Sequence, residues 1–194
     1  MKTVLFGLVA TGVAAAAAPE PMMTDCMLKD AGSPFKFTST FHVDAGPGEV
    51  VDAMNNFTGG LQGATGHFHF GINSDQNFIC YNISVDGFRG NYSSPAKTAT
   101  HIHEGAVGKS GPPRIVFPNP EGPEGQHRVT MGCIQGPFVT GVMTNGTDSG
   151  RGFHVRQIEE NPDGFFADLH STEAVPGAVR GQLQKQEVCT VTWM

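Results

Sequence analysis

The segment Thr100-His101-Ile102-His103-Glu104-Gly105 decides how the fold of this chain is interpreted. Side chains along a β-strand alternate between its two faces, so residues two apart point the same way. As a strand, the segment projects His101 and His103 from one face and turns the apolar Ile102 to the other. The pattern therefore predicts a strand with one buried apolar side and one histidine-bearing side.

A second pair with the same spacing, His67-Phe68-His69, lies upstream. Neighbouring strands are about 5 Å apart, and same-face residues on one strand are about 7 Å apart. If the two strands meet in one sheet, we expect four imidazoles in one patch. Imidazole suits zinc, copper, nickel and iron, and Cu(II) heads the divalent affinity series. The hypothesis is a copper site with all-histidine ligation, with zinc as the alternative ion.

The remainder of the chain predicts an all-β fold in one domain. It has 194 residues, of which 26 are Gly and 13 are Pro, and this composition is typical of short strands joined by turns. Hydrophobic residues make up 39% of the sequence, enough for a core. Alternating or short apolar segments predict strands near residues 35–43, 66–72, 77–85, 114–117, 129–142, 164–171 and 178–183.

Charge and hydropathy exclude two classes of partner. The net charge is −6, and no basic stripe is present to neutralise the phosphates of a nucleic acid. After the N-terminal segment, no stretch approaches the ~20 apolar residues that a membrane-spanning helix needs. We therefore expect neither nucleic-acid binding nor a membrane span.

The N-terminus predicts secretion. Residues 1–18 combine Lys2 with an apolar, alanine-rich stretch that is too short to span a bilayer, the pattern of a signal peptide. Residues 19–34 then form a leader, and residues 35–194 form the β domain. The localisation expected from this pattern is extracellular.

Cysteine and asparagine patterns fit an exported protein. Four widely spaced cysteines without a C-x-x-C motif predict two disulfides, for which three pairings are possible. We favour Cys26–Cys189, which ties the ends, and Cys80–Cys133, which ties the middle. Four sequons predict N-glycosylation, at Asn56, Asn82, Asn91 and Asn145.

Two blocks resemble the CHRD domain, a family named after chordin. One is His101-Ile-His-Glu-Gly-Ala-Val-Gly-Lys-Ser-Gly-Pro-Pro-Arg-Ile-Val-Phe117, and the other is Phe166-Ala-Asp-Leu-His-Ser-Thr-Glu-Ala-Val-Pro-Gly-Ala-Val-Arg-Gly-Gln-Leu183. The resemblance implies an antiparallel sandwich or barrel, immunoglobulin-like or similar to Cu,Zn superoxide dismutase. It also implies that His170 lies on a strand that belongs with the His101–His103 strand.

The His-x-His strand is also similar to the copper-binding strands of Cu,Zn superoxide dismutases, and His154 lies in a segment with part of that likeness. This similarity implies dismutation of superoxide, a small anion that a nearby cation such as Arg180 would attract. The candidate metal ligands are therefore His67, His69, His101, His103, His170 and His154, and the sequence leaves open which of them bind. The competing hypothesis is a non-catalytic extracellular CHRD binding module, or a protein that sequesters metal.

Overall fold

The structure, a computed structural model that describes residues 35–186, consists almost entirely of antiparallel strands. The larger sheet has the spatial order β11 (Gln184–Lys185), β1 (Ser39–Ala45), β2 (Thr65–Asn73), β3 (Phe78–Asp86) and β6 (Arg128–Gln135). The smaller sheet has the order β10 (Ala174–Gln182), β9 (Phe165–Ser171), β4 (Thr100–Glu104) and β5 (Pro113–Phe117). The predicted all-β antiparallel fold is confirmed.

The remaining elements are short. A hairpin is formed by β7 (Met143–Thr144) and β8 (Thr147–Asp148), and the helical turns are η1 (Pro47–Glu49), α1 (Arg156–Glu160) and η2 (Pro162–Gly164). In the described part of the chain, no helix has the length and apolar character needed to cross a bilayer. The expected signal peptide, leader and Cys26–Cys189 disulfide lie outside the described residues.

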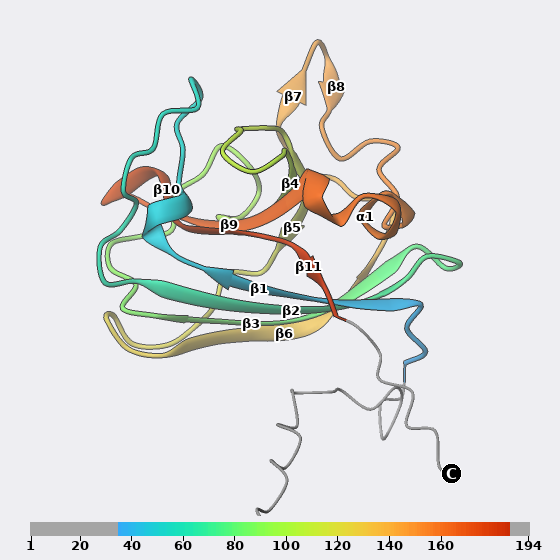
Figure 1. Cartoon of the computed structure of the whole chain (residues 1–194), viewed down its shortest axis with the longest axis horizontal. Helices are drawn as coiled ribbons and strands as arrows, with labels where there is room; N and C mark the ends of the chain where they lie inside the picture. Colours follow the sequence, from blue (N-terminus) through green and yellow to red (C-terminus); the bar gives the residue numbers. More distant parts are fainter. Residues whose placement is uncertain (1–34, 187–194) are drawn as a thin grey trace, which may run out of the picture.

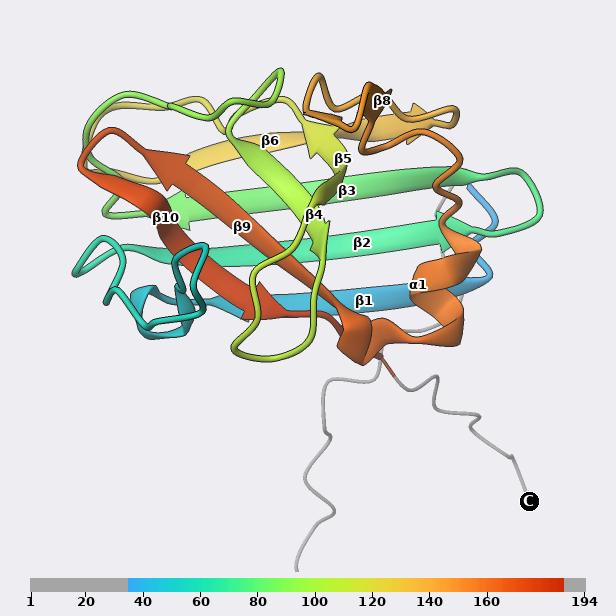
Figure 2. The same ribbon diagram turned by 90° about the horizontal axis from the view of Figure 1, so that it is seen from above.

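The two sheets form a sandwich, which is the first of the two architectures expected. Figure 1 shows the larger sheet below the smaller one, and Figure 2 shows the strands of the two sheets crossing obliquely. Large apolar side chains from both inner faces fill the space between them and make one continuous core. Its largest fully buried members include Phe41, Phe68, Ile83, Ile102, Phe117 and Leu169.

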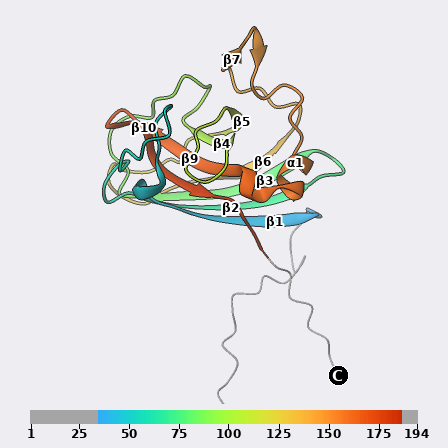
Figure 3. The same cartoon turned by 45° about the horizontal axis from the view of Figure 1, so that its top comes forward.

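Alternation of side chains decides which face of each sheet meets this core. On β1, the inward residues Phe41 and Val43 are fully buried, whereas Asp44 is exposed. On β4, Ile102 faces the core, so His101 and His103 face away from the larger sheet. They are nevertheless buried, because loops cover the outer face of the smaller sheet. Figure 3 shows loops and the β7–β8 hairpin rising above this face.

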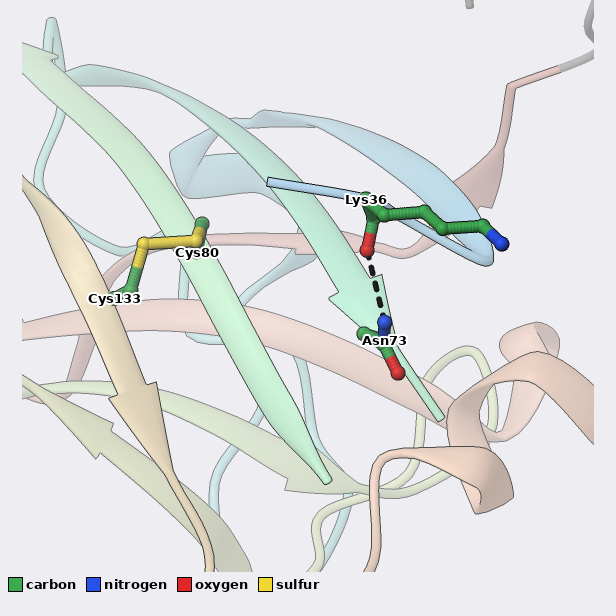
Figure 4. Close-up of a disulfide and its surroundings, with 4 residues drawn as sticks. All are labelled: Lys36, Asn73, Cys80 and Cys133. Carbon is green, nitrogen blue, oxygen red and sulfur yellow. Dashed lines mark hydrogen bonds between the residues drawn. A yellow bond between two sulfur atoms is a disulfide. The ribbon is translucent and has the colours of Figure 1, made fainter. Parts of the chain in front are cut away.

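Local sequence fixes the β2–β3 hairpin. The side-chain oxygen of Asn73 accepts hydrogen bonds from the backbone N–H groups of Asp75 (3.0 Å) and Gln76 (2.9 Å), so the chain turns there. Its side-chain nitrogen donates to the carbonyl of Lys36 at 2.9 Å (Figure 4). The same view shows the Cys80–Cys133 disulfide, which joins β3 to β6 at directly opposed positions and confirms the expected pairing of these two cysteines.

Candidate metal centre

Four metal-binding side chains meet on the outer face of the smaller sheet. β4 supplies His101 and His103, and the adjacent strand β9 supplies Asp168 and His170. Asp168 lies directly opposite His101 in the antiparallel register. Both strands place these residues two apart, so all four project from one face.

The donor atoms of these side chains lie close together. His101 Nδ1 is 3.2 Å from His103 Nε2, and each of these nitrogens is 3.3 Å from Asp168 Oδ1. The other carboxylate oxygen of Asp168 lies 3.1 Å from His170 Nε2. One donor atom from each residue can be chosen so that all lie within 4.8 Å of one another. Among the described residues, this is the one group of three or more donors that meets this spacing.

Backbone carbonyls fix the orientation and tautomer of two rings. His101 Nε2 lies 2.6 Å from the Thr98 carbonyl oxygen, and His103 Nδ1 lies 2.8 Å from the Gly111 carbonyl oxygen. A carbonyl only accepts, so each of these nitrogens carries the proton and donates it. In the neutral rings, the lone pairs of His101 Nδ1 and His103 Nε2 therefore face each other. Metal-binding histidines are usually held in this way: one ring nitrogen donates its hydrogen to a carbonyl, and the other nitrogen is left to bind the ion.

Asp168 gives the strongest physical indication of a cation. Only 5% of this residue is exposed, and its Oδ1 has no hydrogen-bond partner. A buried carboxylate costs several kcal/mol unless a positive charge or hydrogen bonds compensate it. Metal bonds of 2.0–2.1 Å in tetrahedral geometry separate neighbouring ligand atoms by about 3.3–3.4 Å. The observed separations match that spacing, so a metal ion would satisfy both the carboxylate and the facing lone pairs.

The pKa shifts agree with a site that is ready to bind metal. Burial lowers the pKa of His101, and the neighbouring Asp168 offsets this only in part, so the ring stays neutral near pH 7. Burial would raise the pKa of Asp168, but the nearby His103 and His170 outweigh it and hold this pKa well below its usual range. Burial would also lower the pKa of His170, but the charge of the Asp168 carboxylate, 3.1 Å away, outweighs it and raises this pKa.

We expect protons to compete with the metal mainly at His170. A metal ligand must be deprotonated, and the raised pKa of His170 keeps a proton on this ring at higher pH than on an ordinary imidazole. Metal affinity should therefore fall as the pH falls through that raised pKa, starting above the usual value of 6.5. Calorimetric titrations between pH 8 and pH 5.5, in buffers of different ionisation enthalpy, measure both the affinity and the protons released. An affinity that stays constant over this range would contradict the expectation.

The raised pKa of His170 has the opposite effect on the pH dependence of folding: this residue stabilises the metal-free protein more at low pH, where metal binding is weaker. Because the folded pKa of His170 is raised, its contribution to stability is fully present below about pH 6.5 and is lost as the pH rises through the folded value. A metal ion at this position would displace that proton and take the place of the His170 charge as the partner of Asp168.

A pocket of about 330 Å³ opens onto the four side chains. Arg180 lies in its wall, directly opposite Asp168 on β10, and only 4% of it is exposed. The guanidinium carbon lies 3.5 Å from the centre of the Phe166 ring, and that ring stacks on His103. The Nη2 atom of Arg180 donates a hydrogen bond to the Ala106 carbonyl at 3.1 Å. Apolar residues make up much of the remaining wall, among them Val50, Val51, Pro95, Val142 and Pro176.

The expected union of the two His-x-His pairs does not form. His67 and His69 lie on β2 in the larger sheet, where Phe68 points into the core. Their rings therefore face outward from the opposite side of the sandwich to His101 and His103. The physical reason is that alternation decides the face of a strand and not the sheet that it joins. Two pairs with identical local patterns can thus lie on opposite outer faces.

The other predicted candidates divide in the same way. His170 joins His101 and His103, as the resemblance implied. His154 precedes α1, where its Nδ1 accepts a hydrogen bond from the backbone N–H of Arg156 at 3.2 Å, and it is outside the group of donors. Asp168 is a fourth member of the group that is not among the residues predicted from the sequence. Its sequence signal is the Asp-x-His spacing with His170, which repeats the geometry of the His-x-His pair.

Comparison with known proteins adds one match. A family model described as the CHRD domain matches residues 47–183, a range that contains all four donors. No curated protein matches the chain. No solved structure matches it either.

Proposed function

The chain belongs to the CHRD domain family, and from that premise we propose that it is an extracellular binding module that holds one divalent transition-metal ion. The ligands are His101, His103, His170 and Asp168. The observation that carries the proposal is the buried Asp168 oxygen without a hydrogen bond, 3.3 Å from two imidazole nitrogens. In the metal-free protein, His170 beside the other carboxylate oxygen offsets the buried charge in part, but Asp168 Oδ1 lacks a hydrogen bond and the two imidazole lone pairs face each other.

Zinc and copper are the two ions that suit this donor set. Imidazole nitrogen binds both, and a carboxylate oxygen completes a tetrahedral zinc site. The separations of 3.2–3.3 Å among His101 Nδ1, His103 Nε2 and Asp168 Oδ1 fit tetrahedral zinc, with His170 as the fourth ligand. Copper(II) binds nitrogen ligands more tightly than the other divalent ions of its row, and a tetragonal arrangement suits it best.

Features outside the site support export. The apolar N-terminal segment has the pattern of a signal peptide, and Cys80 and Cys133 form a disulfide, a bond typical of oxidising compartments. All four predicted glycosylation asparagines lie on the surface, where a glycan can be attached. They are Asn56, Asn82, Asn91 and Asn145.

The second candidate function is superoxide dismutation at copper in the same place. It is favoured by one observation, the burial of Arg180 in the wall of a pocket that opens onto the four donors. Copper would supply the one-electron chemistry, and the Arg180 cation would attract the small anion. The balanced reaction consumes two superoxide anions and two protons and gives O2 and H2O2. The non-catalytic module remains the main proposal, because four protein ligands bound together would leave a tetrahedral zinc ion no open coordination position.

Metal analysis of protein purified without a polyhistidine tag tests the main proposal. We expect about one zinc or copper ion per chain in the wild type, and its loss in the His103→Ala variant, because that change removes a ligand. The matched control is His154→Ala, which changes a histidine outside the donor group and should leave the ion in place. Protein that contains no metal and cannot be loaded with zinc or copper would contradict the proposal.

Superoxide consumption by copper-loaded protein separates the two functions. The Arg180→Ala variant keeps all four ligands, so its copper content should match that of the wild type. If the protein is a dismutase, its rate of superoxide consumption should fall in this variant and vanish in His103→Ala. Bound copper without superoxide consumption would rule out the catalytic candidate and support binding or sequestration.

A further inference from the structure

A second group of histidines lies on the outer face of the larger sheet. His42 and Asp44 on β1 stand directly opposite His69 and His67 on β2, respectively. The residues between them, Val43 and Phe68, are fully buried in the core. The four polar side chains therefore project together from the face of the sandwich that lies away from the first site.

Hydrogen-bond distances link these four side chains into one chain of contacts. Asp44 Oδ1 lies 2.9 Å from His42 Nε2 and 2.8 Å from His67 Nδ1. The other nitrogen of the His42 ring, Nδ1, lies 3.4 Å from His69 Nδ1, and the two ring centres are 4.7 Å apart. Asp44 thus orients the His42 ring through Nε2, so that the Nδ1 atom of His42 faces His69. His67 holds the same carboxylate from the other side.

We propose that His42 Nδ1 and His69 Nδ1 chelate a divalent transition-metal ion such as Zn²⁺ at a second site. Their separation of 3.4 Å is the spacing of two neighbouring ligands about 2.0–2.1 Å from a tetrahedral ion. Asp44 accepts a hydrogen bond from His42 Nε2, the arrangement of carboxylate, histidine and metal by which many sites orient their ligands. Asp44 and His67 are positioning residues here, and His42 and His69 are the ligands.

The exposure of this group decides how tightly it binds. About a quarter of the His42 side chain and two thirds of the Asp44 side chain are exposed, so water completes the coordination. Two protein ligands at an exposed position bind more weakly than four at a buried one. This second site shares no ligand with the first and lies on the opposite side of the sandwich, so either site can fail without the other.

Calorimetric titration with Zn²⁺ tests the second site in the full, untagged protein. The wild type should show two binding events, a tight one from the first site and a weaker one from the second. His42→Gln and His69→Gln should each abolish the weaker event and leave the tight one unchanged. Asp44→Asn should weaken the second event by about 10–100-fold, as losses of outer-sphere partners do. His67→Gln should weaken it less, because it changes only the position of Asp44.

The matched control is His127→Gln. His127 is also exposed and paired with a carboxylate, that of Asp86 at 3.1 Å, but it lies outside the His42–His69 pair. Its replacement should leave both binding events unchanged. Zinc binding that is the same in the wild type, His42→Gln and His69→Gln, whether it shows one event or two, would overturn the proposal and leave the group with a purely structural role.

Discussion

Addition of Zn²⁺ to metal-free protein is expected to raise its melting temperature by about 8–16 °C when free zinc reaches ~1,000 times the dissociation constant. A ligand at that concentration stabilises the folded state by about 4 kcal/mol. Each kcal/mol shifts the melting temperature of a domain of this size by about 2–4 °C. The physical source of the effect is the neutralisation of the buried Asp168 carboxylate and of the facing imidazole lone pairs. Differential scanning calorimetry with and without zinc measures it.

Two variants determine whether the shift comes from the first site. His103→Ala removes a buried ligand and should lose most of the zinc-induced shift. His42→Gln changes only the exposed outer face of the larger sheet and should retain it. An equal shift in both variants would mean that the stabilisation comes from somewhere other than the buried group.

Removal of the Cys80–Cys133 disulfide is the change with the second large expected effect. The bond closes a loop with a sequence separation of 53, and loop-closure entropy predicts a stabilisation of about 4 kcal/mol at 25 °C. The double variant Cys80→Ala/Cys133→Ala should therefore unfold at lower denaturant and melt about 8–16 °C lower. Equilibrium denaturation followed by circular dichroism measures the difference. A loss of less than about 1 kcal/mol would contradict this expectation.

The disulfide also bears on the metal site. The loop between Cys80 and Cys133 contains β4 and β5, and β4 carries His101 and His103. The other two proposed ligands of the metal site lie on β9, which is outside this loop and later in the chain. Loss of the bond should therefore lower stability without changing which atoms bind, and zinc should restore part of the lost melting temperature. This recovery is the control that separates a weaker fold from a damaged site.

The local sequence pattern predicted most of the strands, because the alternation of apolar and polar residues in a strand depends on which of its faces is buried. The alternation around Ile102 placed His101 and His103 on one face, and the structure shows them there. The strand expected near residues 66–72 corresponds to β2, whereas the one expected near 129–142 was too long, because β6 ends at Gln135, just before Gly136-Pro137. These features depend on a few neighbouring residues, so they are visible in the sequence.

The arrangement of the strands in space could not be obtained in this way. The pairs at 67/69 and 101/103 have the same local pattern, yet β2 and β4 belong to different sheets. Which strands become neighbours depends on contacts between distant segments, about which periodicity says nothing. His170 was placed with β4 only through the family resemblance.

Asp168 was not predicted as a ligand, and for a different reason. The Asp-x-His spacing was present in the sequence, but a carboxylate on an apolar strand has no distinguishing mark until its neighbours are known. The structure supplies that mark, because Asp168 stands opposite His101 and is buried. Only the pairing of β9 with β4 shows that Asp168 lies at the centre of the proposed site.

The most direct test of the central claim is anomalous diffraction at the zinc absorption edge from crystals grown with zinc. We expect an anomalous peak about 2.0–2.2 Å from His101 Nδ1, His103 Nε2, His170 Nε2 and one carboxylate oxygen of Asp168. The absence of a peak between these four side chains, in crystals whose zinc is found elsewhere, would contradict it.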